Sequence, residues 1–291
     1  MSATAALELR EVTKDFVVGL RGVRLRAVDR LTLTVAAGEI FGLLGSNGSG
    51  KSTTLKIILG FIAPTSGSCA IFGVPCARPD ARIAVGYLPE SPDFYRYLTG
   101  RELVGFYGRL AGLSGKHVSD FAAEAIEQVG MTSAADRRVG TYSKGMLQRI
   151  GLAQAIVHEP KLLILDEPTA GVDSIAASAI SQLLLTLRNR GTTIVITSHL
   201  LGQIEELCDR IAILDRGRLL VEGRVSELIN ADAKSGLRLA SMPCHERAEL
   251  DRWLGARGYP ASNSDIPRVR LDEVFREHVT GQNRRECEPM L

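Results

Sequence analysis

The chain has 291 residues, 45% of them hydrophobic, which suits one large domain or one domain with a small appendage. Its 35 basic and 33 acidic residues leave a formal charge of +2, which argues against a nucleic-acid-binding surface. The five cysteines are scattered and form no C-x-x-C pair, so we expect reduced thiols. The N-terminus does not resemble a signal peptide, and the longest uncharged run (57–77) is broken by prolines and glycines. We therefore expect no membrane-spanning segment.

Two strands are expected near the N-terminus, at residues 7–12 and 31–35. In the basic segment between them, arginines alternate with apolar residues, which favours a half-exposed strand. Phe16 lies between the two strands as well. It is either a core residue or an aromatic surface on which a purine base stacks, and the residue by itself favours the core.

Residues 45–52 fit the phosphate-loop pattern G-x-x-x-x-G-K-[ST]. A short buried strand (39–44) precedes them and an apolar-faced helix (53–59) follows, which is the context that the pattern requires. Small residues let successive N–H groups turn toward phosphate oxygens, and the helix N-terminus adds partial positive charge. Lys51 is expected to reach the outer phosphates and the Ser52 hydroxyl to ligate Mg²⁺. The predicted nucleotide contacts here are Gly45, Ser46, Asn47, Gly48, Ser49, Gly50, Lys51, Ser52 and Thr53.

Two further strands, at 68–72 and 83–88, are followed by a concentration of aromatic side chains between residues 94 and 107. This cluster predicts either the core of a helical subdomain or a surface on which a partner docks. A helix is expected at 119–129, capped by Ser119 and closed by a glycine, and another helix before Pro160.

Residues 162–165 are four consecutive aliphatic side chains, which indicates a strand covered on both faces, as in a parallel sheet. Asp166 and Glu167 follow at its C-terminal end, where open α/β sheets bind ligands. Asp166 is placed to hold Mg²⁺ through water, and Glu167 to accept a proton from, or to orient, an attacking water. After a helix capped by Asp173 or Ser174, another buried strand (193–197) ends two residues before His199, a candidate γ-phosphate contact. Alternating strands and helices predict an α/β fold.

Between these two motifs, residues 142–149 read Tyr-Ser-Lys-Gly-Met-Leu-Gln-Arg and open a helix. This stretch resembles the signature sequence of the ATP-binding-cassette family of ATPases. The resemblance covers residues 7 to about 228. It implies that Ser143 and Gly145 bind the γ-phosphate of an ATP held by a second copy, so that two ATP molecules are enclosed in a head-to-tail homodimer.

The same resemblance implies roles for other positions. Glu167 corresponds to the family's catalytic carboxylate, Asp166 to its Mg²⁺ ligand and His199 to its switch histidine. Phe16 lies where the family places its adenine-stacking aromatic. Glu90 replaces a glutamine that usually senses Mg²⁺, and a carboxylate can still ligate the ion. Lys144 and Met146 also depart from the usual signature, without removing Ser143 or Gly145.

The implied architecture is a P-loop NTPase (RecA-like) core with an antiparallel β subdomain and a helical subdomain at about 91–160, all within residues 1–228. A small C-terminal α/β extension is expected at 229–291. Tyr87-Leu88-Pro89-Glu90, the signature and the segment 271–275 resemble ATPase subunits of bacterial exporters of drugs, lipids and polysaccharides. The expected function is therefore ATP hydrolysis that drives a separate membrane permease from the cytoplasmic face of the inner membrane.

Two alternatives remain. A soluble ATPase of this family that acts in translation or repair is disfavoured, because such members carry two cassettes or a long coiled-coil insertion, and the chain has neither. A metabolic kinase could use the same phosphate loop, but it would not explain residues 142–149.

Overall fold

The computed structural model describes residues 5–19, 22–198 and 201–230. The chain divides into two compact units, Met1–Gly223 and Arg224–Leu291. In the second unit the described part is Arg224 and the short helix α7 (Val225–Asn230). The strand and helices expected between residues 236 and 291 lie outside the described residues.

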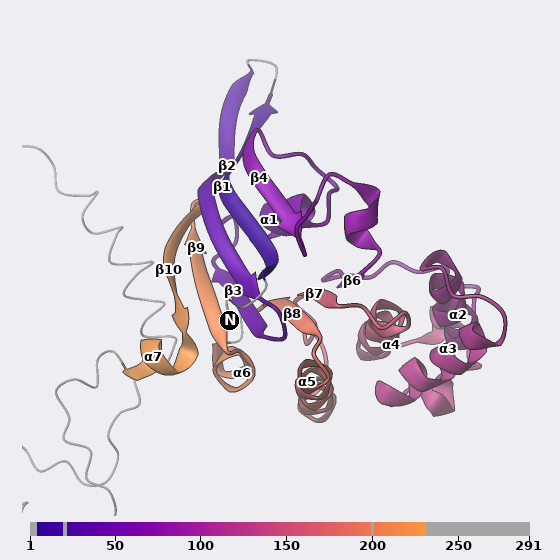
Figure 1. Ribbon diagram of the computed structural model, residues 1–291. Coiled ribbons are helices and arrows are strands. Elements are labelled where there is room, and N and C mark those ends of the chain that lie inside the picture. Colours follow the sequence, from indigo (N-terminus) through magenta and orange to yellow (C-terminus); the bar gives the residue numbers. More distant parts are fainter. Residues whose placement is uncertain (1–4, 20–21, 199–200, 231–291) are drawn as a thin grey trace, which may run out of the picture. The chain divides into compact units, whose positions relative to one another are not determined.

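A four-stranded sheet with the order β2-β1-β4-β5 is antiparallel at every pairing. Apolar residues alternate along β1 and β2, and their buried members, such as Leu7, Leu9 and Val35, face the core. In Figure 1, β1 and β2 extend together well beyond the end of β4. The strands are β1 (Ala5–Val18), β2 (Val23–Ala36), β4 (Ser66–Ile71) and β5 (Val74–Pro75).

A six-stranded sheet has the order β10-β9-β3-β8-β7-β6. The five strands from β9 to β6 run parallel, as their continuous apolar runs predict. The order places β8 between β3 and β7, so the C-terminal ends of these three strands share one edge. The strands are β3 (Ile40–Gly45), β6 (Val85–Leu88), β7 (Leu162–Asp166), β8 (Thr193–Thr197), β9 (Arg210–Asp215) and β10 (Arg218–Arg224).

The helices begin at recognisable caps. Thr99 and Glu102 form a reciprocal capping box at α2, and the Asp173 carboxylate accepts from the Ala176 N–H at 2.9 Å to start α5. The helices are α1 (Lys51–Ile58), α2 (Gly100–Leu110), α3 (Lys116–Gln128), α4 (Lys144–Ile156), α5 (Ser174–Asn189) and α6 (Leu201–Leu207). Short 3₁₀ turns are η1 (Pro79–Arg82), η2 (Thr132–Ala134) and η3 (Val139–Thr141). Among the described residues, no helix combines the length and the apolar character needed to cross a bilayer.

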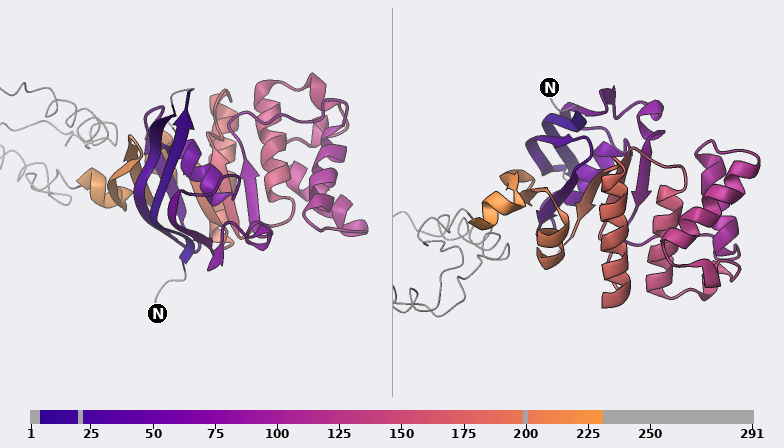
Figure 2. Two further views of the ribbon diagram at one scale, coloured as in Figure 1. Left: turned by 90° about the horizontal axis from the view of Figure 1, so that it is seen from above. Right: turned by 60° about the horizontal axis from the view of Figure 1, so that its bottom comes forward.

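The main core lies around α1. Leu55 and Ile58 of α1 pack in one cluster with Leu9 of the antiparallel sheet and with Phe41 and Leu43 of β3. Helices α2, α3 and α4 pack against one another and form a separate group, coloured magenta in Figures 1 and 2, on the side away from the antiparallel sheet. The α/β fold and its two subdomains therefore agree with the prediction.

Two predictions are wrong in detail. Ser119 does not cap α3, because Gly115, with φ of 60°, lets the chain enter the helix a turn earlier; the Ser119 hydroxyl instead donates to the Lys116 carbonyl at 2.8 Å. The thiols are not all reduced, since Cys69 and Cys76 are paired as a disulfide across the β4–β5 hairpin, with 5.5 Å between their Cα atoms. Cys208 is free and buried.

Candidate nucleotide-binding and hydrolysis site

The phosphate-loop residues connect the end of β3 to the start of α1, as predicted. Ser46 is exposed, whereas Ser49 is buried and donates its N–H to the Ser46 carbonyl at 3.1 Å. Lys51 is the first residue of α1, and its Nζ donates to the carbonyls of Gly45 at 2.7 Å and Ser46 at 3.1 Å. The ammonium therefore lies beside the loop backbone, at the helix N-terminus where phosphate binds favourably.

Gly50 shows why this loop needs a glycine immediately before the lysine. Its φ of 106° is strained for other residues, and a Cβ there would lie 2.6 Å from the Ala27 carbonyl oxygen of β2. Its own carbonyl accepts the Thr54 N–H at 2.9 Å and the Thr54 hydroxyl at 3.0 Å, which starts α1. The loop is thus shaped by backbone contacts, and Asn47 and Gly48 remain exposed to a ligand.

The two carboxylates lie at the end of β7, on the same sheet edge. Thr197, the last residue of the intervening strand β8, is fully buried. Its hydroxyl donates to Asp166 Oδ1 at 2.5 Å and accepts the Glu167 N–H at 3.1 Å, and its carbonyl also accepts that N–H at 3.1 Å. Glu167 has a φ of 51°, a conformation that non-glycine residues rarely adopt. Thr197 therefore orients one carboxylate directly and fixes the backbone of the other.

Electrostatics join the loop to this edge. Burial lowers the pKa of the Lys51 ammonium, while Glu167, Asp166 and Glu90, in that order, act to raise it. The net pKa of Lys51 lies below its ordinary value of 10.5. Three carboxylates from two separate parts of the chain thus place negative charge within reach of one half-buried ammonium, and metal ions and phosphate groups complement such an arrangement.

Phe16 lies on β1 opposite Leu25 of β2 and is half-buried. The Lys14 ammonium lies over its ring, 5.2 Å from the centroid. The same β1–β2 hairpin brings the Ala27 carbonyl to Gly50, so Phe16 is carried by the element that meets the phosphate loop. The ring is therefore neither a fully buried core residue nor remote from the site.

The signature residues lie elsewhere, beside the loop that follows β7. Ser143 caps α4, and its hydroxyl accepts the Met146 N–H at 3.3 Å. A Cβ on Gly145 would lie 3.9 Å from Val172 Cα, and one on Gly171 would lie 2.7 Å from Lys144 Cδ. Within one copy, the signature thus packs against Gly171 and Val172.

Two residues that the sequence analysis did not single out connect these parts. Thr197 is one of them. Gln148 of α4 is the other; it is 1% exposed, and its Nε2 donates to the Glu167 carbonyl at 3.3 Å. A polar residue on the buried face of a predicted helix was the available signal for Gln148. His199 lies outside the described residues.

The ABC transporter family model matches residues 28–170. An uncharacterised ABC transporter ATP-binding protein of Synechocystis sp. is 37% identical over 78% of this chain and 65% of its own length. The Nod factor export ATP-binding protein I of Rhizobium meliloti is 39% identical over 81% and 69%. The daunorubicin/doxorubicin resistance ATP-binding protein of Streptomyces peucetius is 40% identical over 79% and 71%. The first of these is thus covered over slightly less than two thirds of its length.

Solved structures agree. An ATP-binding subunit of an ABC transporter superposes with a TM-score of 0.71 and 28% identity, over 80% of this chain and 95% of that one. A dimeric ATP-binding cassette in a post-hydrolysis state, bound to ADP and Pi, gives 0.70 and 26%, over 75% and 98%. The fold and site define a P-loop nucleotide-binding protein. Together with these relatives, they show that the chain belongs to the family of ABC transporter ATP-binding proteins, as its signature predicted.

Proposed function

We propose that this chain binds and hydrolyses ATP as the nucleotide-binding subunit of a membrane exporter whose permease is a separate polypeptide. The observation that carries the proposal is the convergence of Lys51, Asp166 and Glu167 at one sheet edge, with attraction between the ammonium and both carboxylates. Phosphoryl transfer depends on this combination of a positioned cation and carboxylates at the transferred group.

The residues present at this edge also fit Mg²⁺, which prefers hard oxygen ligands. The Ser52 hydroxyl is exposed in the first turn of α1, and Asp166 is held by Thr197. Ser52, Asp166 and Glu90 would hold the ion, Asp166 through water. When bound, Mg²⁺ neutralises charge on the phosphate oxygens.

The chain's own residues account for the remaining chemistry. The phosphate loop from Gly45 to Thr53 supplies N–H donors, and Lys51 supplies a positive charge. Glu167, fixed by the two bonds from its N–H to Thr197, orients or deprotonates the attacking water. His199 is proposed to contact the γ-phosphate from the end of β8, and Phe16 to stack on adenine.

The signature residues Ser143 and Gly145 are proposed to complete the site of a second copy. In one copy Gly145 lies beside Val172. The exposed Ser143 hydroxyl and the start of α4 are suited to an anion that approaches from outside the chain. Hydrolysis would then require an ATP-bound homodimer.

A surface beside Glu90 is proposed to receive the permease. Tyr95 and Tyr97 are 52% and 66% exposed, and their rings lie 5.8 Å apart. A neighbouring cavity of about 530 Å³ is lined by residues that include Phe94, Tyr107 and Leu110. We assign export because the named relatives include an exporter of Nod factor and a drug-resistance protein.

We further propose that residues 1–228, with a helical subdomain at about 91–160, form the nucleotide-binding domain, and that 229–291 form an extension. The protein would act at the cytoplasmic face of the inner membrane. Recovery in the membrane fraction that depends on the partner gene would support this location. Recovery in the soluble fraction whether or not the partner gene is present would favour the alternative, a soluble ATPase of this family that is not coupled to transport.

The hydrolysis proposal is tested by two substitutions, one expected to impair ATP binding and the other to impair turnover alone. Lys51→Ala should weaken ATP binding, because it removes the cation of the phosphate loop. Glu167→Gln should bind ATP as the wild type does but hydrolyse it about 100-fold or more slowly, because the general base is lost. Nucleotide binding is measured by calorimetry and turnover by phosphate release. Undiminished turnover by Glu167→Gln would remove Glu167 from the catalytic role.

A further inference from the structure

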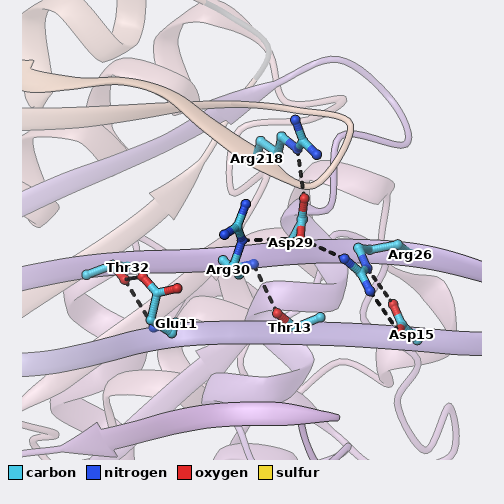
Figure 3. A network of polar contacts seen from close by, with 8 residues as sticks. All are labelled: Glu11, Thr13, Asp15, Arg26, Asp29, Arg30, Thr32 and Arg218. Carbon is cyan, nitrogen blue, oxygen red and sulfur yellow. Dashed lines mark hydrogen bonds and ion pairs between the residues drawn. The ribbon is translucent and has the colours of Figure 1, made fainter.

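Asp29, on β2, is the one charged residue among the buried residues that the structure describes, with 8% of its surface exposed. A buried carboxylate is costly unless it is paired and hydrogen-bonded. Figure 3 shows the pairing: Arg218 Nε donates to Asp29 Oδ2 at 2.8 Å, and Arg26 donates to Oδ1 at 3.0 Å. Arg30 also approaches Oδ1, at 4.0 Å. Three arginines thus converge on one carboxylate.

The backbone beside this carboxylate leads to the phosphate loop. The Asp29 N–H donates to the Gly217 carbonyl at 2.8 Å, and the Gly217 N–H donates to the Ser49 carbonyl at 2.9 Å. Gly217 lies in the turn between β9 and β10. The bond from Gly217 to Ser49 uses a carbonyl of the phosphate loop. It therefore does not consume any loop N–H group that could bind a phosphate oxygen.

Strand β2, the phosphate loop and the β9–β10 turn are in close contact through their backbones. A Cβ on Gly217 would lie 2.7 Å from the Ala27 carbonyl oxygen and 3.0 Å from Val28 Cα, and Gly217 has a φ of 81°. Gly50 contacts the same Ala27 carbonyl and lies close to Gly217 Cα. The turn therefore fills the space between β2 and the loop, and any shift of the turn must move the Ser49 carbonyl or break its bond.

Charge determines how firmly the turn is held. Burial acts to raise the pKa of the Asp29 carboxyl, but hydrogen bonds and attraction from Arg218 and Arg26 outweigh it and leave the pKa below its ordinary value of 3.8. Asp29 is therefore ionised near neutral pH. Asp29 holds two neighbouring residues: its backbone N–H bonds to the Gly217 carbonyl, and its carboxylate accepts from the Arg218 side chain.

We propose that Asp29 and Arg218 are positioning residues for ATP: they clamp the β9–β10 turn against the Ser49 carbonyl and thereby hold the phosphate loop in its binding conformation. The inference rests on the proposed ATPase function and extends it to residues that contact neither the nucleotide nor the reacting atoms. It assigns the long β1–β2 hairpin a second role, which is to brace the phosphate loop from behind.

The test compares three variants of the full chain. Asp29→Asn removes the negative charge of the carboxylate at nearly constant shape. Arg218→Gln removes the positive charge of the guanidinium, at a side chain that is 68% exposed and thus tolerant of change. Asp15→Asn is the matched control, because Asp15 pairs with Arg26 on the same hairpin but makes no hydrogen bond to the turn or the phosphate loop among the described residues. The readouts are the ATP dissociation constant by calorimetry, KM and kcat for hydrolysis, and the melting temperature without nucleotide.

We expect Asp29→Asn and Arg218→Gln each to raise the ATP dissociation constant and KM about three- to tenfold, with kcat at saturating ATP within about twofold of the wild type. The double variant should be no weaker than the more affected single variant, since both remove one clamp. Asp15→Asn should leave KM unchanged. If Asp29→Asn does not fold, Arg218→Gln carries the test.

Unchanged KM in Arg218→Gln, or an equal rise in KM in Asp15→Asn, would overturn the inference. A loss of melting temperature without a change in ATP affinity would assign the network to stability alone and would also overturn it. Failure of the wild type to bind ATP is a separate result, since it would reject the proposed function and not the clamp.

Discussion

Thr197 belongs to none of the motifs in the sequence, yet its hydroxyl contacts both Asp166 and Glu167. It donates to the Asp166 carboxylate and accepts the Glu167 N–H. It is fully buried at the end of β8. The geometry of both carboxylates therefore depends on a residue from the neighbouring strand.

We expect Thr197→Val to lower kcat about 10- to 100-fold with little change in ATP affinity, because a hydrogen bond to a carboxylate contributes roughly 1.5–3 kcal/mol. Steady-state hydrolysis and calorimetric ATP binding measure the two quantities. Thr197→Ser is the control, since it keeps the hydroxyl and should retain most of the activity. Equal losses in both variants would show that the methyl group, and not the hydrogen bond, matters.

At this scale, sequence alone can point to a candidate site where its residues are consecutive in the chain. The phosphate loop and the pair Asp166-Glu167 are local patterns, and the strand context on each side could be predicted too. Thr197 and Gln148 could not be identified in this way. Their roles follow from the order β3-β8-β7 and from the packing of α4, and spacing along the chain contains neither.

Among the elements, α2 shows how one segment can serve both the core and the surface. Leu103 and Val104 are buried, while Phe106 and Tyr107 join the aromatic group that Tyr95 and Tyr97 extend into solvent. The two predictions for this group, a subdomain core and a docking surface, are therefore compatible. Which partner it receives is part of the proposal.

Tyr97→Ala should abolish or strongly reduce transport while the ATPase activity of the isolated chain stays unchanged. Tyr97 is 66% exposed and its ring packs against Tyr95, so its loss should weaken docking and not catalysis. Transport is measured in cells and hydrolysis on the purified chain. Tyr97→Phe keeps the ring and should transport normally; unaffected transport by Tyr97→Ala would reject the docking surface.

The hairpin of β1 and β2 should show a defined acid sensitivity. The hydrogen bond from Arg26 is the largest influence on the Asp15 carboxyl and lowers its pKa below the ordinary 3.8, and the pKa of Asp29 is also lowered. Carboxyls with lowered pKa values stabilise the fold above their unfolded pKa, and this stability is lost as the pH falls through their folded values.

The contribution of this network to the free energy of unfolding should therefore be constant above about pH 5. It should decrease as the pH is lowered below 3.8, the ordinary pKa of both carboxyls. Denaturant titrations of the wild type and of Asp15→Asn at a series of pH values measure it. The two curves should converge in acid. A stability difference that persists unchanged at pH 2 would show that the ionised carboxylate is not its source.

Element types were largely predictable, because apolar periodicity and turn residues are local signals. The starts of elements were less so: Gly115 begins α3 a turn before Ser119. The Cys69–Cys76 disulfide was missed because it depends on the pairing of β4 with β5. This pairing places two thiols that are seven residues apart in sequence opposite each other.

For the whole molecule, the decisive feature is that one copy does not bring its own signature to its own phosphate loop in any described contact. Ser143 and Gly145 lie at the start of α4 beside residues 170–173, while Lys51 lies with Asp166 and Glu167 at the sheet edge. A head-to-tail dimer would supply each phosphate loop with a signature from the other copy. Contacts between two copies do not occur within one chain. The proposed dimer therefore rests on the family's signature.

The most direct measurement is the molar mass of Glu167→Gln by light scattering, with and without Mg·ATP. We predict that Glu167→Gln is a monomer that becomes a dimer when Mg·ATP is added. With Ser143→Arg added to block the signature, the protein should stay monomeric in Mg·ATP. A variant that binds ATP by calorimetry yet remains monomeric, alone and with its membrane partner, would contradict the shared site.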